Sequence, residues 1–140
     1  IFLTFNAPLA SRIYAGSDMF LMPSQAEPCG TSQMIAMRYG SVPIVRATGG
    51  LADTVRNVDP VTGHGNGFDF NRYDCWMLFA AIVRAVETYR HRGVWQQLQK
   101  RGMQADFSWE QSAGEYVDLY RRAIASRIPR PGLEAYQVQS

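Results

Sequence analysis

The sequence has few cysteines and no long apolar run. Its two cysteines, Cys29 and Cys75, are too few for a disulfide framework and favour a reducing compartment. No apolar run approaches the roughly 20 residues needed to span a bilayer. The first residues also lack the charged region and cleavage site of a secretory signal. These absences argue against a disulfide-rich secreted domain and against a membrane protein.

A concentration of positive charge is also missing. The formal net charge is +2, and the 14 lysine and arginine residues are spread along the chain. A protein that follows a phosphate backbone needs such residues on one face, so nucleic acid is not expected as a partner. With 46% hydrophobic and 19% charged residues, the 140-residue chain has the composition of one soluble globular unit with a buried core.

Short apolar segments alternate with segments of helical periodicity. Strands are expected at residues 1–5, 18–23, 42–46 and 68–70, with helical segments between and after them. This alternation predicts an α/β fold in which helices cover both faces of a parallel sheet. The abrupt start on the strand IFLTF suggests a fragment of a longer domain. We expect residues 1–126 to belong to that domain and 127–140 to form a poorly ordered tail.

Several helix boundaries carry recognisable signals. Asn6 is a plausible N-cap for the first helix, and Ser108 with glutamine three residues later has the form of a capping box. A helix of about ten residues is expected to follow Thr31 and to end near Gly40. The three tryptophans fall on predicted apolar helix faces, so we expect them in the core: Trp76, Trp95 and Trp109.

The loop between residues 23 and 32 has the composition of a ligand-binding loop. It follows a strand, and in a parallel α/β sheet ligands bind at the carboxyl ends of the strands. Gly30 would let the backbone approach a ligand, and the free N–H groups near Thr31 and Ser32 would meet a phosphate. The carboxylate of Glu27 would accept hydrogen bonds from hydroxyls. Phosphate beside hydroxyls describes a sugar nucleotide.

Other interpretations of the same residues stay open. Glu27 could be only a solvated charge or a partner of the helix dipole, and Gly30 only a turn residue. Cys29 could be a thiol nucleophile activated by a helix N-terminus, although neither histidine, His64 or His91, has an evident connection to it. The glycine pair in the loop of Thr48, Gly49 and Gly50 is weak evidence of a second ligand-binding loop. No second metal ligand stands at a useful spacing from His64.

The segment IYAGSDMFLMPSQAEPCGTSQMIAMRYGSVPIVRATGGLADTV closely resembles bacterial glycogen synthases and plant or cyanobacterial starch synthases. These are retaining glycosyltransferases that extend α-1,4-glucan from ADP-glucose. The resemblance covers roughly residues 1 to 126 and is most specific around EPCG and ATGGLADTV. It implies the GT-B architecture, of which this chain would form part of the C-terminal, nucleotide-sugar-binding, Rossmann-like domain. The N-terminal domain of that architecture would then lie outside the chain.

The resemblance also implies roles for individual residues. Glu27 would bind the donor glucose and support the reacting centre as the catalytic residue. The backbone N–H groups of Cys29 and Gly30 would hold glucose hydroxyls, and those of Thr31 and Ser32 the distal phosphate. Phe5 would stack on the nucleotide base. The loop of Thr48, Gly49 and Gly50 would border the same pocket.

The implied substrates are ADP-glucose as donor and an α-1,4-glucan as acceptor, with no metal and no cofactor. The implied location is the plastid stroma or the bacterial cytoplasm. Gln25, Ala26 and Thr31 depart from the family, which more often has arginine, phenylalanine and leucine there. Since groups required for catalysis would lie upstream of Ile1, the chain by itself is expected to be inactive.

Two other functions compete with the glucan synthase. One is a non-catalytic protein, truncated or regulatory, that keeps the fold for nucleotide or glucan binding. The other is a related transferase with a different donor or acceptor, such as a sucrose or trehalose-phosphate synthase. The cysteine of EPCG and the uncharged Ile35 argue against this second alternative.

Overall fold

The computed structural model describes residues 6–127 of the chain. Contacts between residues divide the chain into two compact units, Ile1–Ala105 and Asp106–Ser140. The larger unit holds the sheet, and the smaller one holds a single described helix. The expected strand at residues 1–5 and the expected tail lie outside the described residues, apart from Arg127. The predicted domain boundary at residue 126 stays a prediction.

The elements of the described residues alternate between helix and strand as far as β3. The helices are α1 (Ala7–Gly16), α2 (Ser32–Arg38), α3 (Gly50–Thr54), α4 (Cys75–Tyr89), α5 (Arg92–Gln104) and α6 (Trp109–Ser126). The strands are β1 (Met19–Met22), β2 (Val42–Arg46) and β3 (Phe68–Phe70). The three predicted strands that fall within the described residues are therefore present.

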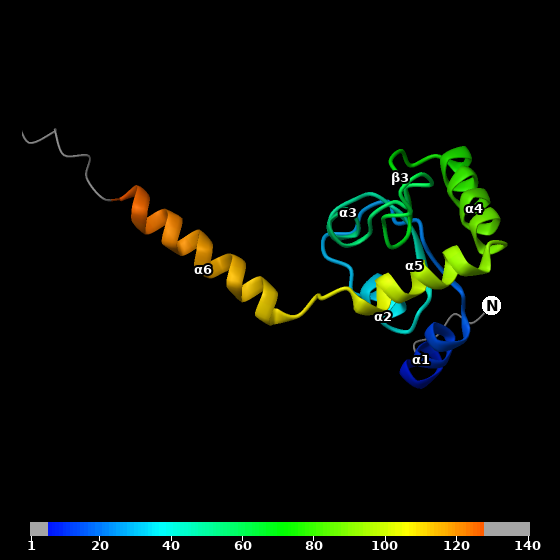
Figure 1. Cartoon of the computed structure of the whole chain (residues 1–140), viewed down its shortest axis with the longest axis horizontal. Coiled ribbons are helices and arrows are strands. Elements are labelled where there is room, and N and C mark those ends of the chain that lie inside the picture. The colour runs from blue at the N-terminus through cyan, green and yellow to red at the C-terminus, as the bar shows by residue number, and fades with distance from the viewer. Residues whose placement is uncertain (1–5, 128–140) are drawn as a thin grey trace, which may run out of the picture. The chain divides into compact units, whose positions relative to one another are not determined.

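Among the described residues, the strands form one parallel sheet in the order β1-β2-β3. Met19 of β1 lies opposite Val42, and Ile44 of β2 lies opposite Phe68. Because the strands are parallel, α2 and then α3 must return the chain to the start of the next strand. In Figure 1, α4 and α5 follow β3 within unit 1. The carboxyl ends of all three strands consequently meet at one edge of the sheet.

Both faces of the sheet are packed, as the alternation predicted. Val42 and Ile44 of β2 belong to the same buried cluster as Phe68, Trp95 and Leu98, on the face covered by α4 and α5. Val45, on the opposite face, packs in a second cluster supplied by α2 and α3: Met37, Leu51 and Val55. A central strand buried on both faces reads as a continuous apolar run, which is why VPIVR was recognisable.

The predicted helix starts at Asn6 and Ser108 are confirmed. The Asn6 side chain accepts a hydrogen bond from the backbone N–H of Leu9 at 3.0 Å. The Ser108 hydroxyl accepts one from Gln111 at 3.5 Å, which is the capping-box bond. Both side chains supply an acceptor to a first-turn N–H that has no partner within the helix.

Two of the sequence predictions about helices are wrong. The helix after Thr31 spans seven residues, not about ten, because Tyr39 is its C-cap and Gly40 turns the chain with a φ of +84°. Trp95 is buried, but Trp76 and Trp109 are 73% and 84% exposed. Helical periodicity finds an apolar face, but it does not show whether another part of the chain covers that face.

The smaller unit, taken by itself, contains the amphipathic helix α6. None of its residues is buried, and its exposed apolar side chains include Leu119, Tyr120 and Ile124. Among the described residues, no helix is both long and apolar enough to cross a membrane.

Candidate functional site

The loop between β1 and α2 begins at the carboxyl end of β1, where ligands of parallel α/β sheets bind. Glu27 is half-buried in this loop, and Cys29 is exposed. Gly30 has a φ of +66°, a conformation that favours glycine. A Cβ at this position would lie 3.0 Å from Cγ of Glu27 and 2.8 Å from Oε1 of Gln33. Gly30 therefore keeps the loop closed against both side chains.

A second loop, Ala47–Gly50, supports the first loop from the carboxyl end of β2. The Gly50 N–H donates to the Glu27 carbonyl oxygen at 3.1 Å. A Cβ on Gly49 would lie 1.9 Å from that oxygen, and one on Gly50 would lie 1.7 Å from the Cys29 carbonyl oxygen. Only glycine at both positions permits such backbone contact. The structure thus brings the two predicted ligand loops together.

Arg46, the last residue of β2, fixes the start of the Glu27 loop. Its guanidinium donates through Nε to the Ser24 carbonyl at 2.8 Å and through a second nitrogen to the Gln25 carbonyl. It also donates to the Asn71 carbonyl at 3.4 Å and lies 5.9 Å from the centre of the Tyr73 ring. Arg46 was not among the residues predicted to form the site. Its sequence signal is a charged residue at the end of an otherwise buried strand.

Gln33 connects both loops from within α2 and was also missed. Its Nε2 donates to the Gly30 carbonyl at 2.8 Å and to the Thr54 hydroxyl at 3.0 Å. The Thr54 hydroxyl in turn donates to the Gly50 carbonyl at 2.7 Å. Gln33 is fully buried, and an uncharged amide can serve several partners there. A polar residue on the apolar face of the helix was the sequence signal.

We predict that Gln33→Leu destabilises the protein and disorders the Glu27 loop. Leucine is similar in size, but it leaves the Gly30 carbonyl without its donor and removes the donor to the Thr54 hydroxyl, which keeps its own bond to Gly50. Losing the partner of a buried group costs about 1–3 kcal/mol, and removing the Gln33 Oε1, which has no partner among the described residues, offsets part of this cost. The melting temperature should fall by several degrees, whereas Gln104→Leu at an exposed position should leave it nearly unchanged. Equal melting temperatures for Gln33→Leu and the wild type would contradict the proposed connection.

The first N–H groups of α2 have no hydrogen-bond acceptor within the helix, as at every helix N-terminus. Thr31 is the N-cap residue, its side chain forms no capping hydrogen bond, and its carbonyl accepts from Ile35 at 3.0 Å. Ser32 is the first helical residue. Thr31 and Ser32 therefore lie at the start of the helix, and their role in binding phosphate stays a prediction. Because α2 has only seven residues, its dipole is small. Binding of an anion here would depend mainly on hydrogen bonds from these local N–H groups.

Of the remaining residues predicted to form the site, Phe5 lies outside the described residues. Thr48 is half-buried, and its carbonyl accepts a hydrogen bond from Leu51 at 3.1 Å. Among the described residues, no hydrogen bond joins Cys29 to either histidine, so the thiol-nucleophile alternative gains no support. His91 is the N-cap residue of α5. His64 closes a turn in which the backbone N–H of Asp59 donates to the His64 carbonyl oxygen at 2.8 Å.

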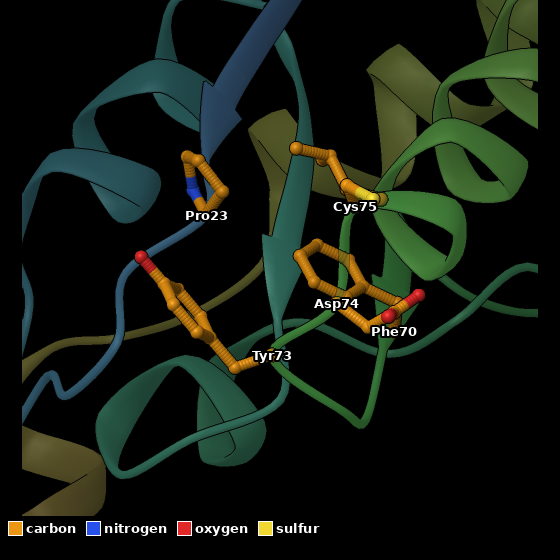
Figure 2. Close-up of a pocket in the computed structure, with 6 residues that line it drawn as sticks. Pro23, Phe70, Tyr73, Asp74 and Cys75 are labelled. Carbon is orange, nitrogen blue, oxygen red and sulfur yellow. The ribbon is translucent and has the colours of Figure 1, made fainter.

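A largely apolar cavity of about 270 Å³ opens at the same edge of the sheet. In Figure 2, Pro23 and Tyr73 lie on one side of it, and Phe70, Asp74 and Cys75 lie on the other. Of the predicted substrate-binding residues that the structure describes, none lines this cavity. Within the same part of the chain, the residue that joins the cavity to the Glu27 loop is Pro23, at the end of β1. We therefore place the candidate site in the two backbone loops and not in this cavity.

The family described as "Glycosyl transferases group 1" matches residues 1–102, nearly three quarters of the chain. The chain belongs to the group 1 glycosyl transferases. This match includes both loops of the candidate site. Together with the parallel sheet and its flanking helices, it confirms the predicted fold class.

Curated relatives of this transferase chain are glycogen synthases. That of Gloeobacter violaceus is 57% identical over 123 residues, which cover 88% of this chain and 27% of the relative. Glycogen synthase 1 of Synechocystis sp. is 54% identical over 122 residues, which cover 87% of this chain and 26% of the relative. The predicted resemblance is confirmed. The chain spans about a quarter of the length of the curated relatives it matches.

Solved structures of two other enzymes resemble this transferase chain. The catalytic domain of starch synthase IV from Arabidopsis thaliana, bound to ADP and acarbose, has a TM-score of 0.77 and 44% identity. The match covers 89% of this chain and 26% of that one. Sucrose-phosphate synthase from Thermosynechococcus elongatus has a TM-score of 0.61 and 26% identity, over 88% of this chain and 29% of that one. The starch synthase is the more similar of the two.

Proposed function

We propose that the chain contributes the donor-binding part of a glucan synthase. The proposed reaction transfers glucose from ADP-glucose to the 4-hydroxyl at the non-reducing end of an α-1,4-glucan, with retention at the anomeric carbon. The observation that carries this proposal is the 57% identity to a glycogen synthase over 123 residues. Sucrose-phosphate synthase is less similar in sequence and structure, and no comparison favours a non-catalytic protein.

The donor sugar would lie against the Glu27 loop. Glu27 would accept hydrogen bonds from its hydroxyls and support the reacting centre, and the N–H groups of Cys29 and Gly30 would bind the remaining hydroxyls. The contact of Gly49 and Gly50 with the Glu27–Cys29 backbone supports this assignment, because it holds these donors in one geometry. Such preorganisation matters where groups must meet the transition state with little movement.

The leaving group of the proposed reaction is a nucleoside diphosphate, whose negative charge grows as the glycosidic bond breaks. The N–H groups of Thr31 and Ser32 would stabilise that charge at the distal phosphate. The starch synthase IV structure contains ADP, which supports an adenine nucleotide here. Phe5 stays the proposed partner of the base. The bacterial relatives favour a cytoplasmic location, and the plastid stroma stays the alternative.

We propose that the reaction uses no metal ion and no cofactor, because backbone N–H groups and basic side chains would neutralise the diphosphate. The initial rate after treatment with EDTA should then equal the rate in buffer containing Mg²⁺. Loss of the rate on chelation, with recovery on adding Mg²⁺, would contradict this proposal. Both rates are measured with the same radiolabelled donor.

The function is tested by incorporation of labelled glucose into glycogen by the full-length polypeptide that carries this chain. ADP-glucose should support incorporation, and UDP-glucose at the same concentration should support much less. The product should be degraded by an enzyme specific for α-1,4 bonds, which reports retention. A higher rate with UDP-glucose would reassign the donor, and no incorporation from either donor would contradict the proposed activity.

A further inference from the structure

A second cavity, of about 250 Å³, lies at the amino edge of the sheet. Residues from three parts of the chain line it. They are Asp18 just before β1, Tyr89 and Arg90 at the end of α4, and Arg92, Gln96 and Gln99 on α5. We call this cavity the amino-edge pocket. The Glu27 loop lies at the other edge, and the five residues of β2 between the two edges span about 16 Å at the usual rise per residue. The two sites are therefore separate.

The amino-edge pocket contains a buried donor with no partner. Trp95 also lines it and is only 3% exposed. Among the described residues, the indole Nε1 of Trp95 has no hydrogen-bond acceptor. Native proteins pair nearly all buried polar groups. This nitrogen has almost no accessible surface of its own, so a ligand or water molecule could accept from it only after neighbouring side chains shift.

The other polar groups of the pocket are partly fixed in place. The Tyr89 hydroxyl donates to Asp18 at 3.0 Å. This hydrogen bond raises the pKa of Tyr89, so the phenol stays protonated at neutral pH. Gln99 donates from Nε2 to the Gly40 carbonyl at 2.8 Å, which leaves its amide oxygen to accept. The Tyr89 ring is held edge-on against Trp95, with 5.1 Å between the ring centres. Tyr89 and Gln99 would therefore need little ordering on binding.

The charges of the pocket are mixed. Its lining includes the carboxylate of Asp18 and the guanidinium groups of Arg90 and Arg92. Arg90 pairs at 3.4 Å with Glu87, which is not a lining residue, so the charge of Arg90 is partly balanced from outside the pocket. A phosphate would gain from the arginines and from the N-terminus of α5, but the Asp18 carboxylate would repel it. A neutral ligand rich in hydroxyls can use both kinds of group, since carboxylate and amide oxygens accept from hydroxyls while guanidinium and amide N–H groups donate to them. The chemistry therefore favours a sugar over an anion.

We propose that the amino-edge pocket is a second, non-catalytic binding site for α-glucan, large enough for one or two glucose units. The identity of the sugar rests on the proposed function, because the glucan is the substrate at hand. Hydroxyls of one glucose unit would bind Gln96, Gln99 and Arg92, and the exposed part of the Tyr89 ring would contact the pyranose. A chain held there would raise the local concentration of glucan ends near the transfer site.

The experiment compares two neighbouring glutamines on α5. Gln96 lines the pocket, whereas Gln97 is exposed and does not. The full-length polypeptide is prepared as wild type, as Arg92→Ala/Gln96→Ala and as Gln97→Ala. Native electrophoresis through gels containing amylopectin gives the dissociation constant from the retardation of each protein. Thermal melts verify that all three proteins are folded.

The double variant should bind amylopectin at least roughly tenfold more weakly, because it loses a neutral hydrogen bond from Gln96 and a charge-assisted one from Arg92. Its KM for glycogen should rise by a similar factor, while kcat and the KM for ADP-glucose stay unchanged. Gln97→Ala should match the wild type throughout. Tyr89→Phe should weaken binding less, because the ring remains.

Equal retardation of the double variant and the wild type would overturn the proposal. So would inorganic phosphate that binds tightly and depends on Arg92 while maltoheptaose does not bind, since the pocket would then be an anion site. If the polypeptide transfers no glucose but its retardation still depends on Gln96, the proposed function fails and the glucan site stands. If it transfers glucose and Gln96 has no effect on retardation, the glucan site fails alone.

Discussion

Replacing Glu27 by alanine should lower kcat for glucose transfer by about a hundredfold to a thousandfold, the usual cost of one preorganised group that stabilises the reacting centre. The half-buried carboxylate sits in a loop that is fixed on two sides, so its removal should not be compensated by a neighbouring acid. Glu27→Gln keeps the size of the side chain but removes its charge. It should therefore recover binding of ADP-glucose better than it recovers kcat.

The control for this prediction is Glu115→Ala, which removes an exposed carboxylate in the smaller unit. It should leave kcat and KM at wild-type values. Initial rates with labelled ADP-glucose, together with thermal melts, separate a chemical defect from a folding defect. A well-folded Glu27→Ala protein with a near-normal rate would remove Glu27 from the reaction.

The second large effect is expected from Gly50→Ala. The added Cβ would lie 1.7 Å from the Cys29 carbonyl oxygen and 2.6 Å from its carbon. This overlap cannot be relieved by rotating a side chain, because both groups belong to the backbone. The two loops must move apart by more than 1 Å, and a displacement of that size at a reacting centre costs about a hundredfold in rate. The same overpacking should cost about 1–3 kcal/mol of stability.

Gly93→Ala provides the matched control. It also adds one methyl group to a glycine, but nothing lies within 4 Å of the new Cβ. Since Gly93 lies inside α5, alanine should slightly stabilise the helix. Steady-state kinetics on both variants test the contrast. Unaltered kinetics for Gly50→Ala would show that the contact between the two loops has no part in activity.

Much of the fold followed from local sequence signals. A strand buried on both faces appears as an uninterrupted apolar run, and side-chain caps appear as asparagine or serine before a helix. These signals predicted β2 and the starts of α1 and α6. The exposed Trp76 and Trp109 could not be predicted in the same way, because periodicity reports a helix face and not what covers it.

The candidate site was predictable to the same degree. The carboxyl ends of parallel strands lie at one edge of the sheet, so the sequence predicted that Glu27 and Gly50, which follow β1 and β2, lie close together. It could not show that Arg46 and Gln33 fix the loops, because both bind backbone carbonyls, which every residue has. Contacts of this kind leave no pattern in the sequence except a polar side chain where an apolar one is expected.

We propose that the two touching loops bind the sugar nucleotide. Amide hydrogen exchange of the full-length polypeptide, with and without ADP-glucose, tests this proposal. Exchange should become slower at the N–H groups of residues 29–32 and 49–50, with little change around residues 89–99 at the opposite edge. Protection confined to residues 89–99, or none at residues 29–32 under saturating donor, would contradict it.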